Sequence, residues 1–277
     1  MIFDIGKRGS NNLPQIAAFY KEPNTTGYLP LDFTLTTQFI ADQTDWISPY
    51  IVKAKANIDG DLPLSEHFTG GYHGYDNGAS DAVGTATNTS FKVFADKKLL
   101  TADCDIYANE IVIEVVNLIN ATNTKKADGT GRNVLQETVT YTIVGNKIDV
   151  SVAIKALEDI TIQTYYGIQA YVVAFGNFQF IGDNVMTGVF DTTAGHYGGN
   201  KVDSDCSTMV AMTTTDKLTL HVDNTFGLGK LRYLEATTGV CTYMNYGKMY
   251  FYLINNRDFV ANTALNYRGG YKFESLI

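Results

Sequence analysis

The most regular pattern in the chain is a period-two alternation that predicts a long β-hairpin. The first run of alternate positions reads Leu135, Glu137, Val139, Tyr141 and Ile143. After a break at Gly145 and Asn146, the second run reads Ile148, Val150, Val152 and Ile154. Successive side chains of a strand point to opposite faces, so one face of this hairpin is mainly apolar and the other polar. Gly145 favours a type II′ turn, and a type I′ turn is the alternative.

A third strand pattern follows the hairpin. Ile160, Ile162 and residues 165–169 resume the alternation after a short link. Three consecutive strands that pair in this order form an antiparallel sheet with one dry face, and such a face needs a covering layer. Residues 267–273 predict a final strand at the edge of this sheet or beneath it.

Further strand signals recur along the chain with turn residues between them. They fall at residues 33–39, 91–95, 109–120, 171–175, 178–181, 217–223, 230–236 and 248–254. Residues 13–20 are expected to form one or two helical turns, and no helix of ten or more residues is indicated. The sequence therefore predicts an all-β fold, a large antiparallel β-sandwich for which a supersandwich is one form. We expect a single domain over residues 1–277, with residues 1–30 as a candidate N-terminal arm.

The composition fits large buried sheets. Charged residues make up 18% and apolar residues 45% of the 277 residues, which argues against a disordered chain. The chain has 18 Tyr and 15 Phe, residue types that favour strands. Its net charge of −8 makes a nucleic-acid partner unexpected, because phosphate contacts need basic residues.

Membrane insertion, export and metal binding find no support in the sequence. No apolar run approaches the ~20 residues that a membrane-spanning helix needs. The first residues lack the basic flank and apolar run of a signal peptide, so we expect synthesis and assembly in a cytoplasm. The three cysteines show no CxxC-type spacing. We expect no metal and no other cofactor.

Acid–base chemistry would have to come from the histidines and carboxylates. His221 alternates with apolar neighbours and is predicted to be a solvent-side strand residue. His73 and His196 lie in glycine-flanked loops beside tyrosines, where a His could act as the acid or base of a polysaccharide lyase or hydrolase. No GxSxG, HExxH, P-loop or dinucleotide motif is present. No catalytic residue is therefore assigned.

Glycan binding is the better-supported hypothesis. Aromatic rings in glycine-rich loops can stack on sugars, and amides and carboxylates beside them can bond hydroxyl groups. The candidate ligand-binding residues are Tyr72, His73, Tyr75, Asp76, Asn77, His196 and Tyr197. Tyr165 and Tyr166 are adjacent, so they point to opposite faces and at most one of them reaches solvent.

Several segments resemble a β-rich family found in bacteriophages and gut bacteria. The similar segments are residues 42–53, 69–77, 120–129 and 156–169, within a match over residues 35–170, and more loosely residues 248–252 and 268–271. The family is similar to domains of phage tail-fibre or receptor-binding proteins, sometimes beside esterase modules. The resemblance implies a virion or cell-surface location and a glycan-facing task, and it transfers no residue roles.

The leading hypothesis is a phage virion protein, of the tail or fibre type, that binds a host surface polysaccharide. Its expected partners are that glycan, other virion proteins and further copies of the same chain in a homo-oligomer. The alternatives are a polysaccharide-degrading enzyme with a His/Tyr loop site and a purely structural virion subunit. The expected location is the virion, with an extracellular or cell-surface location as the alternative.

Overall fold

The structure is a computed structural model that describes residues 1–21, 37–40, 45–62, 65–76, 83–181, 185–188, 201–203, 206–231, 241–245 and 247–276. Within these residues nearly all regular structure is β-strand, and every strand pairing is antiparallel. The predicted fold class, an all-β antiparallel sandwich, is therefore confirmed.

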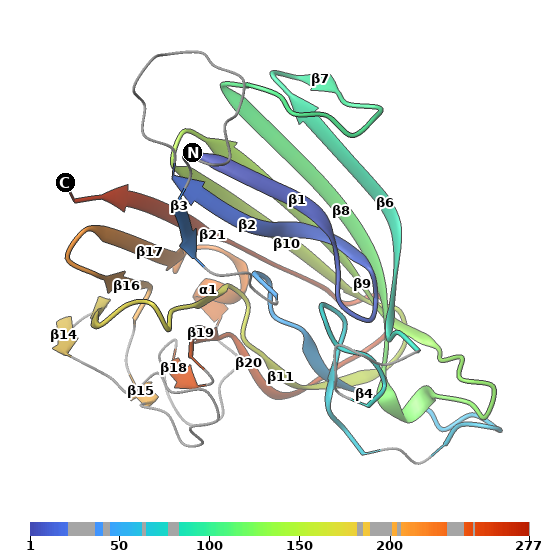
Figure 1. The fold of residues 1–277 in the computed structure, drawn as a ribbon. Helices are drawn as coiled ribbons and strands as arrows, with labels where there is room; N and C mark the ends of the chain where they lie inside the picture. Colours follow the sequence, from blue (N-terminus) through green and yellow to red (C-terminus); the bar gives the residue numbers. More distant parts are fainter. Residues whose placement is uncertain are drawn as a thin grey trace.

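One layer is a large curved sheet (Figure 1). Ten described strands form it, in the spatial order β14 (Val185–Gly188), β13 (Asn177–Ile181), β16 (Thr208–Met212), β17 (Asp216–Val222), β21 (Ala264–Ser275), β10 (Lys147–Ala156), β9 (Asn133–Val144), β8 (Glu110–Asn120), β6 (Ala86–Ala95) and β7 (Lys98–Leu99). In Figure 1 the sheet runs from β14 and β16 at the lower left, through β17 and β21, to β8 and β6 at the upper right.

Three smaller sheets lie against this layer. The first contains β1 (Ile2–Arg8), β2 (Leu13–Lys21) and β3 (Thr37–Ile40). The second contains β20 (Ile254–Phe259), β11 (Ile160–Tyr165), β4 (Tyr50–Ala54) and β5 (Phe68–Thr69). The third contains β12 (Gln169–Tyr171), β19 (Lys248–Tyr252), β18 (Cys241–Asn245) and β15 (Lys201–Asp203). Two short helical segments complete the described elements, η2 (Thr122–Thr124) and α1 (Gly227–Leu231).

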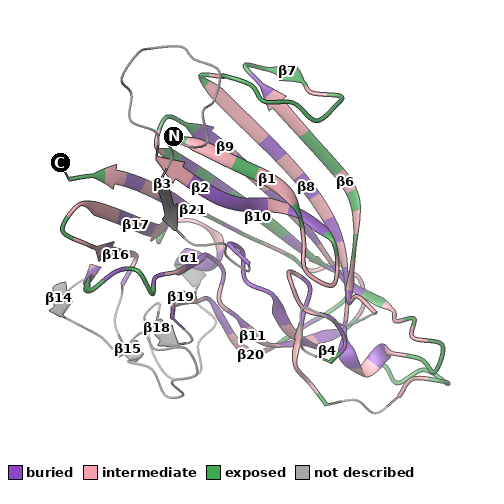
Figure 2. Cartoon of the chain, in the orientation of Figure 1, coloured by how far each residue is buried: buried purple, intermediate pink, exposed green. Residues whose placement is uncertain are grey.

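The central hairpin has the predicted register and turn. Val144 of β9 pairs with Lys147 of β10, which leaves Gly145 and Asn146 as a two-residue loop. Gly145 has φ +59° and Asn146 has no positive φ, so the turn matches type II′ and excludes type I′. Buried and exposed residues alternate along β10 without exception. Buried and half-buried residues alternate in the same way along most of β8, whose purple and pink bands are visible in Figure 2. The alternation in the sequence therefore reflects one face packed on the core and one face in solvent.

Strand pairing around the hairpin differs from the prediction. The third strand, β11, does not pair with β10 but crosses to the opposite layer, where it lies between β4 and β20. Its place beside β10 is taken by β21, which continues the sheet into β17. The C-terminal strand is thus central in the large sheet rather than at its edge or beneath it.

Aromatic side chains join the layers. Phe19 of β2 stacks on Phe273 of β21 with ring centroids 4.4 Å apart, and Trp46 lies 4.4 Å from Phe19 and 5.1 Å from Tyr271. The hydroxyl of Tyr271 donates a hydrogen bond of 2.5 Å to the Trp46 carbonyl oxygen. Trp46 is 1% exposed, so the segment before β4 is fixed at the centre of the sandwich.

Three local predictions were wrong, the first being the strand at residues 171–175, because β12 ends at Tyr171 and residues 172–175 form a turn. Residues 13–20 form strand β2 instead of helical turns, and Ile16 and Phe19 lie in the core, so the described N-terminal residues are part of the sandwich rather than an arm. Residues 227–231 form α1, where the sequence predicted a strand from residue 230; residues 232–236 lie outside the described part of the chain. Within the described residues, no helix has the length and apolar character that crossing a membrane requires.

Candidate functional site

The glycine-rich loop after β5 has the shaped backbone that its sequence indicates. Gly70 and Gly71 have φ values of +77° and +50°, a region that glycine enters without strain. The N–H of His73 donates to the Gly70 carbonyl oxygen at 3.0 Å and closes a tight turn. The turn presents the side chains of Tyr72 and His73, both partly exposed, beside β5.

Asp45 holds this turn from behind. Its carboxylate accepts a 2.6 Å hydrogen bond from the Tyr72 N–H and lies 3.4 Å from the Nε2 atom of His73. The Asp45 side chain is fully buried, and its backbone has φ +54°, a strained value for a non-glycine residue. The side-chain amide of Gln169 donates to the Asp45 carbonyl oxygen at 2.5 Å. Asp45 therefore positions both Tyr72 and His73.

The predicted glycan-binding residues divide into three groups. Tyr72, His73 and Asp76 reach the surface, Asp76 being exposed. Tyr75 is only 5% exposed; its hydroxyl accepts a hydrogen bond from the Asn120 amide at 3.1 Å, so its expected role as an exposed stacking ring is wrong. Asn77, His196 and Tyr197 lie outside the described residues.

Aromatic rings continue from this turn across two sheets. Phe68 of β5 lies 5.5 Å from the His73 ring and 6.0 Å from the Tyr166 ring. Tyr166, which follows β11, lies 4.6 Å from Tyr250 and 5.2 Å from Tyr252 of β19. We call the set Phe68, His73, Tyr166, Tyr250 and Tyr252 the aromatic stripe. Four of its members are partly exposed, and Tyr250 is buried beneath Tyr166 at 7% exposure.

Tyr165 and Tyr166 face opposite sides, as predicted. Tyr165 is fully buried and stacks on Tyr50 at 4.4 Å, while Tyr166 is partly exposed. Nothing in the sequence indicated that β5, the end of β11 and β19 would lie side by side. Of the stripe, only His73 is among the candidate ligand-binding residues that the sequence indicated.

A polar cluster lies close to the stripe along the chain, since Glu66 precedes Phe68 by two residues and Gln163 precedes Tyr166 by three. Glu66 accepts hydrogen bonds from the amide of Gln163 and from the ammonium group of Lys53, the latter at 2.7 Å. The bond from Lys53 lowers the pKa of Glu66, so its carboxylate is ionised at neutral pH. A carboxylate, an amide and an ammonium beside aromatic rings supply the acceptors and donors that sugar hydroxyl groups use.

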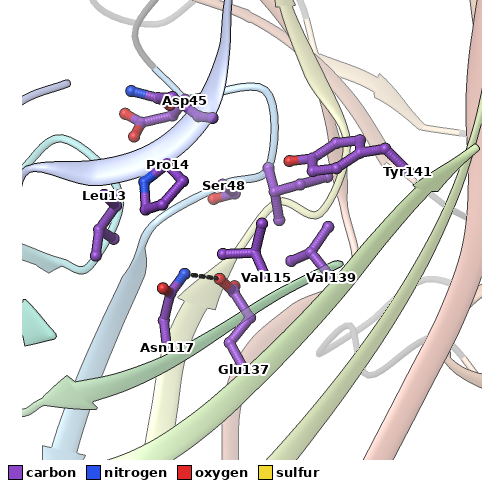
Figure 3. A pocket seen from close by; sticks show the side chains of 12 residues that line it. Leu13, Pro14, Asp45, Ser48, Val115, Asn117, Glu137, Val139 and Tyr141 are labelled. Atoms are coloured by element: carbon purple, nitrogen blue, oxygen red, sulfur yellow. Dashed lines mark hydrogen bonds between the residues drawn. The ribbon is translucent and has the colours of Figure 1, made fainter. Parts of the chain in front are cut away.

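Behind the turn lies a small polar pocket between β2 and strands β8 and β9 (Figure 3). Its lining includes Asp45, Asn117 and Glu137, and its volume is about 30 Å³. A buried water needs a cavity of at least ~10–15 Å³, so the pocket has room for about two waters and not for a sugar ring.

Glu137 is a carboxyl group on the buried face of the large sheet. It accepts hydrogen bonds from the Tyr50 hydroxyl at 2.7 Å and from the Asn117 amide at 3.4 Å. Burial raises the pKa of Glu137 to about 7. The sequence carried the signal for this residue, because Glu137 falls on the apolar set of the hairpin alternation.

Substitution of Gly71 should loosen the turn. A Cβ atom at this position would collide with the Asp45 carboxylate, which would leave the Tyr72 N–H and a buried oxygen unsatisfied at a cost of about 1–3 kcal/mol. Gly60 provides the control, because its φ is +89° and a Cβ atom there meets nothing within 4 Å. We expect Gly71→Ala to lower the free energy of unfolding, measured with urea, by at least ~1 kcal/mol more than Gly60→Ala. Equal losses would show that Asp45 does not hold the turn.

Comparisons with known proteins extend only to the fold. No protein-family model matches the chain, and no curated protein matches it in sequence. Among solved structures, the GH36 α-galactosidase AgaB from Geobacillus stearothermophilus is 9% identical with a TM-score of 0.44, over 82% of this chain and 30% of that chain. The Slr1438 protein from Synechocystis is 8% identical with a TM-score of 0.37, over 99% of this chain and 96% of that chain.

A GalM/aldose epimerase homologue from C. elegans is 12% identical with a TM-score of 0.33, over 98% of this chain and 91% of that chain. The chain spans less than a third of the length of the AgaB chain that it matches. These identities and TM-scores are too low to support an argument about a site or an activity. Phage tail-fibre domains are not among these structures.

Proposed function

We propose that the protein binds carbohydrate through the aromatic stripe. The observation that carries the proposal is the position of Tyr166, whose partly exposed ring contacts Phe68, Tyr250 and Tyr252. Rings held by other rings keep a fixed orientation, and the apolar face of a sugar can stack on such a surface at little entropic cost. Glu66 and Gln163 then bond the hydroxyl groups of the sugar.

The setting that we propose is a phage virion whose tail or fibre recognises a polysaccharide of the host surface. The support is the resemblance of residues 35–170 to domains of phage receptor-binding proteins, together with the glycan-type chemistry of the stripe. Partner virion proteins and a homo-oligomer belong to the same proposal. They can be tested by the mass of the purified protein in solution and by capture of tail proteins.

Replacement of Tyr166 tests the site. We expect Tyr166→Ala to weaken binding to host surface polysaccharide about tenfold or more, since a stacked aromatic ring contributes ~0.5–1.5 kcal/mol beyond its buried area. Tyr166→Phe should keep most of the affinity because it keeps the ring. Tyr107→Ala is the matched control, because Tyr107 is 53% exposed on the loop between β7 and β8. Isothermal titration with purified polysaccharide measures all three, and equal affinity of Tyr166→Ala and wild type would refute the site.

A second candidate function rests on one contact. The Nε2 atom of His73 lies 3.4 Å from the buried Asp45 carboxylate, an arrangement that can orient an imidazole as a general acid or base. If the protein is a lyase or hydrolase, incubation with host polysaccharide will release unsaturated products or new reducing ends. These products will disappear with His73→Ala. Binding without any product leaves the carbohydrate-binding proposal in place.

A further inference from the structure

A larger hollow lies on the outer face of the large sheet, away from the aromatic stripe. Its volume is about 250 Å³, and strands β9, β10, β21 and β17 together with the start of the following loop line it. The side chains that matter for its chemistry are Thr140, Thr142, Asp149, Ser151, His221 and Arg268. The hairpin alternation places four of them on the polar face, so the hollow is part of the surface that does not pack on the core.

The strand register assembles these residues from distant parts of the chain. One row across the sheet runs Thr142, Asp149, Gly270 and His221, each paired with the next. The neighbouring row runs Thr140, Ser151 and Arg268. Adjacent strands are ~4.8 Å apart, so neighbouring side chains in a row lie within reach of one small ligand. The first row reaches from β10 to β17 because β21 lies between these two strands, and the second row ends on β21 itself.

Two glycines of β21 lie at the hollow, Gly269 in its lining and Gly270 beside it in the first row. Gly270 lies between Asp149 and His221 in that row, and a Cβ atom there would collide with the Ile148 carbonyl oxygen and lie 3.1 Å from the Cε1 atom of His221. A residue with a side chain at this position would force these neighbours to move. Asp149 and His221 therefore flank a position that carries no side chain.

The wall next to β17 is rigid and polar. Asp223 accepts hydrogen bonds from the N–H and hydroxyl groups of Thr225, at 2.9 and 2.6 Å, and these bonds lower its pKa. The Arg268 guanidinium lies 4.1 Å from the Phe226 ring centroid and is held there by a cation–π contact. Burial lowers the pKa of His221, so its imidazole is neutral at pH 7. The acidic and basic groups of the lining are therefore Asp149, Asp223 and Arg268.

We propose that this hollow, called the groove from here on, is a second binding site that takes one neutral sugar unit. Its volume lies below the ~300–1,000 Å³ typical of pockets for drug-sized ligands, which matches a single ring rather than an oligosaccharide. Each carboxylate can accept hydrogen bonds from sugar hydroxyl groups, the guanidinium donates, and the Ser and Thr hydroxyls do both. The excess of negative charge disfavours a uronic acid or other anionic sugar. The site stands on its own lining and does not depend on the aromatic stripe.

A filled groove tests the inference. Ser151 is exposed on β10, so Ser151→Tyr occupies the groove without disturbing the core, and Lys155→Tyr adds the same ring on the same strand face outside the groove. Asp149→Asn is a milder second variant, and circular dichroism confirms that each variant is folded. The probes are the methyl glycosides of glucose, galactose and mannose, with glucuronate as the charged comparison, observed by saturation-transfer NMR.

We expect at least one neutral glycoside to bind wild type and Lys155→Tyr equally, to bind Asp149→Asn several-fold more weakly, and to lose at least tenfold in affinity with Ser151→Tyr. The same comparison, repeated in the Tyr166→Ala background where binding at the aromatic stripe is weakened, should give the same losses in affinity, which separates the groove from the stripe. Three results would overturn the inference: no neutral glycoside binds wild type, Ser151→Tyr binds as well as wild type, or glucuronate binds more tightly than every neutral glycoside.

Discussion

Replacing Trp46 with Ala should destabilise the protein by about 3–5 kcal/mol, the range for removing a large aromatic side chain from a packed core. Trp46 is 1% exposed and contacts Phe19 of one layer and Tyr271 of the other. Its removal would open a cavity where the β1–β2 sheet meets the large sheet. Urea denaturation followed by circular dichroism measures the loss, since the variant has no tryptophan to report it.

Trp46→Phe is the matched variant. It keeps an aromatic ring in the same space, and the Trp46 indole N–H makes no hydrogen bond with the described residues, so its removal breaks none of these contacts. We expect Trp46→Phe to lose clearly less stability than Trp46→Ala. A loss below ~1 kcal/mol for Trp46→Ala would mean that the two layers do not depend on this residue.

Replacing Glu137 with Gln should remove a pH-dependent part of the stability. In the folded protein burial raises the pKa of Glu137 to about 7, from an ordinary value of about 4.5. Below the ordinary value both states carry the proton, so Glu137 has no pH effect there. As pH rises towards 7, the unfolded chain releases this proton while the folded chain retains it, so stability falls; above 7 the loss is complete.

The expected size follows from ~1.4 kcal/mol for each pKa unit. The unfolding free energy of Glu137→Gln minus that of wild type should therefore rise by about 2–3 kcal/mol as the pH is raised from 5 to 8. The comparison isolates Glu137, because every other titrating group is common to both proteins. If the difference in unfolding free energy between the two proteins stays constant across this pH range, Glu137 is already ionised in the folded protein at pH 5. That result would contradict the expected effect of burial on its pKa.

The sequence predicted those parts of the fold that depend on local alternation. β8, β9 and β10 each bury one face, so their period-two pattern is visible in the residues. β2 buries residues on both faces and contains adjacent alanines, which removes the alternation and explains the wrong helical assignment. β11 has a clear pattern, but a pattern cannot say which layer a strand joins.

The candidate sites show the same limit. Residues that act together on one segment, such as Tyr72 and His73, could be proposed from the sequence. The aromatic stripe needs β5, β11 and β19 together, and the groove needs β21 between β10 and β17. These contacts join residues that lie about 50 to 120 positions apart, from His221 and Gly270 to Ser151 and Arg268, and no local signal encodes them. The exposure of Tyr75 was mispredicted for a related reason, because its ring is buried where its hydroxyl meets the amide of Asn120 on β8.

The most direct test of carbohydrate binding at the aromatic stripe is hydrogen–deuterium exchange with and without a bound host-surface oligosaccharide. We expect slower exchange on binding in peptides that cover β5 and the 70–76 turn, the end of β11 and β19, with no such change in Tyr166→Ala. Exchange that is unchanged at all three places, while the oligosaccharide is shown to be bound, would contradict the proposal.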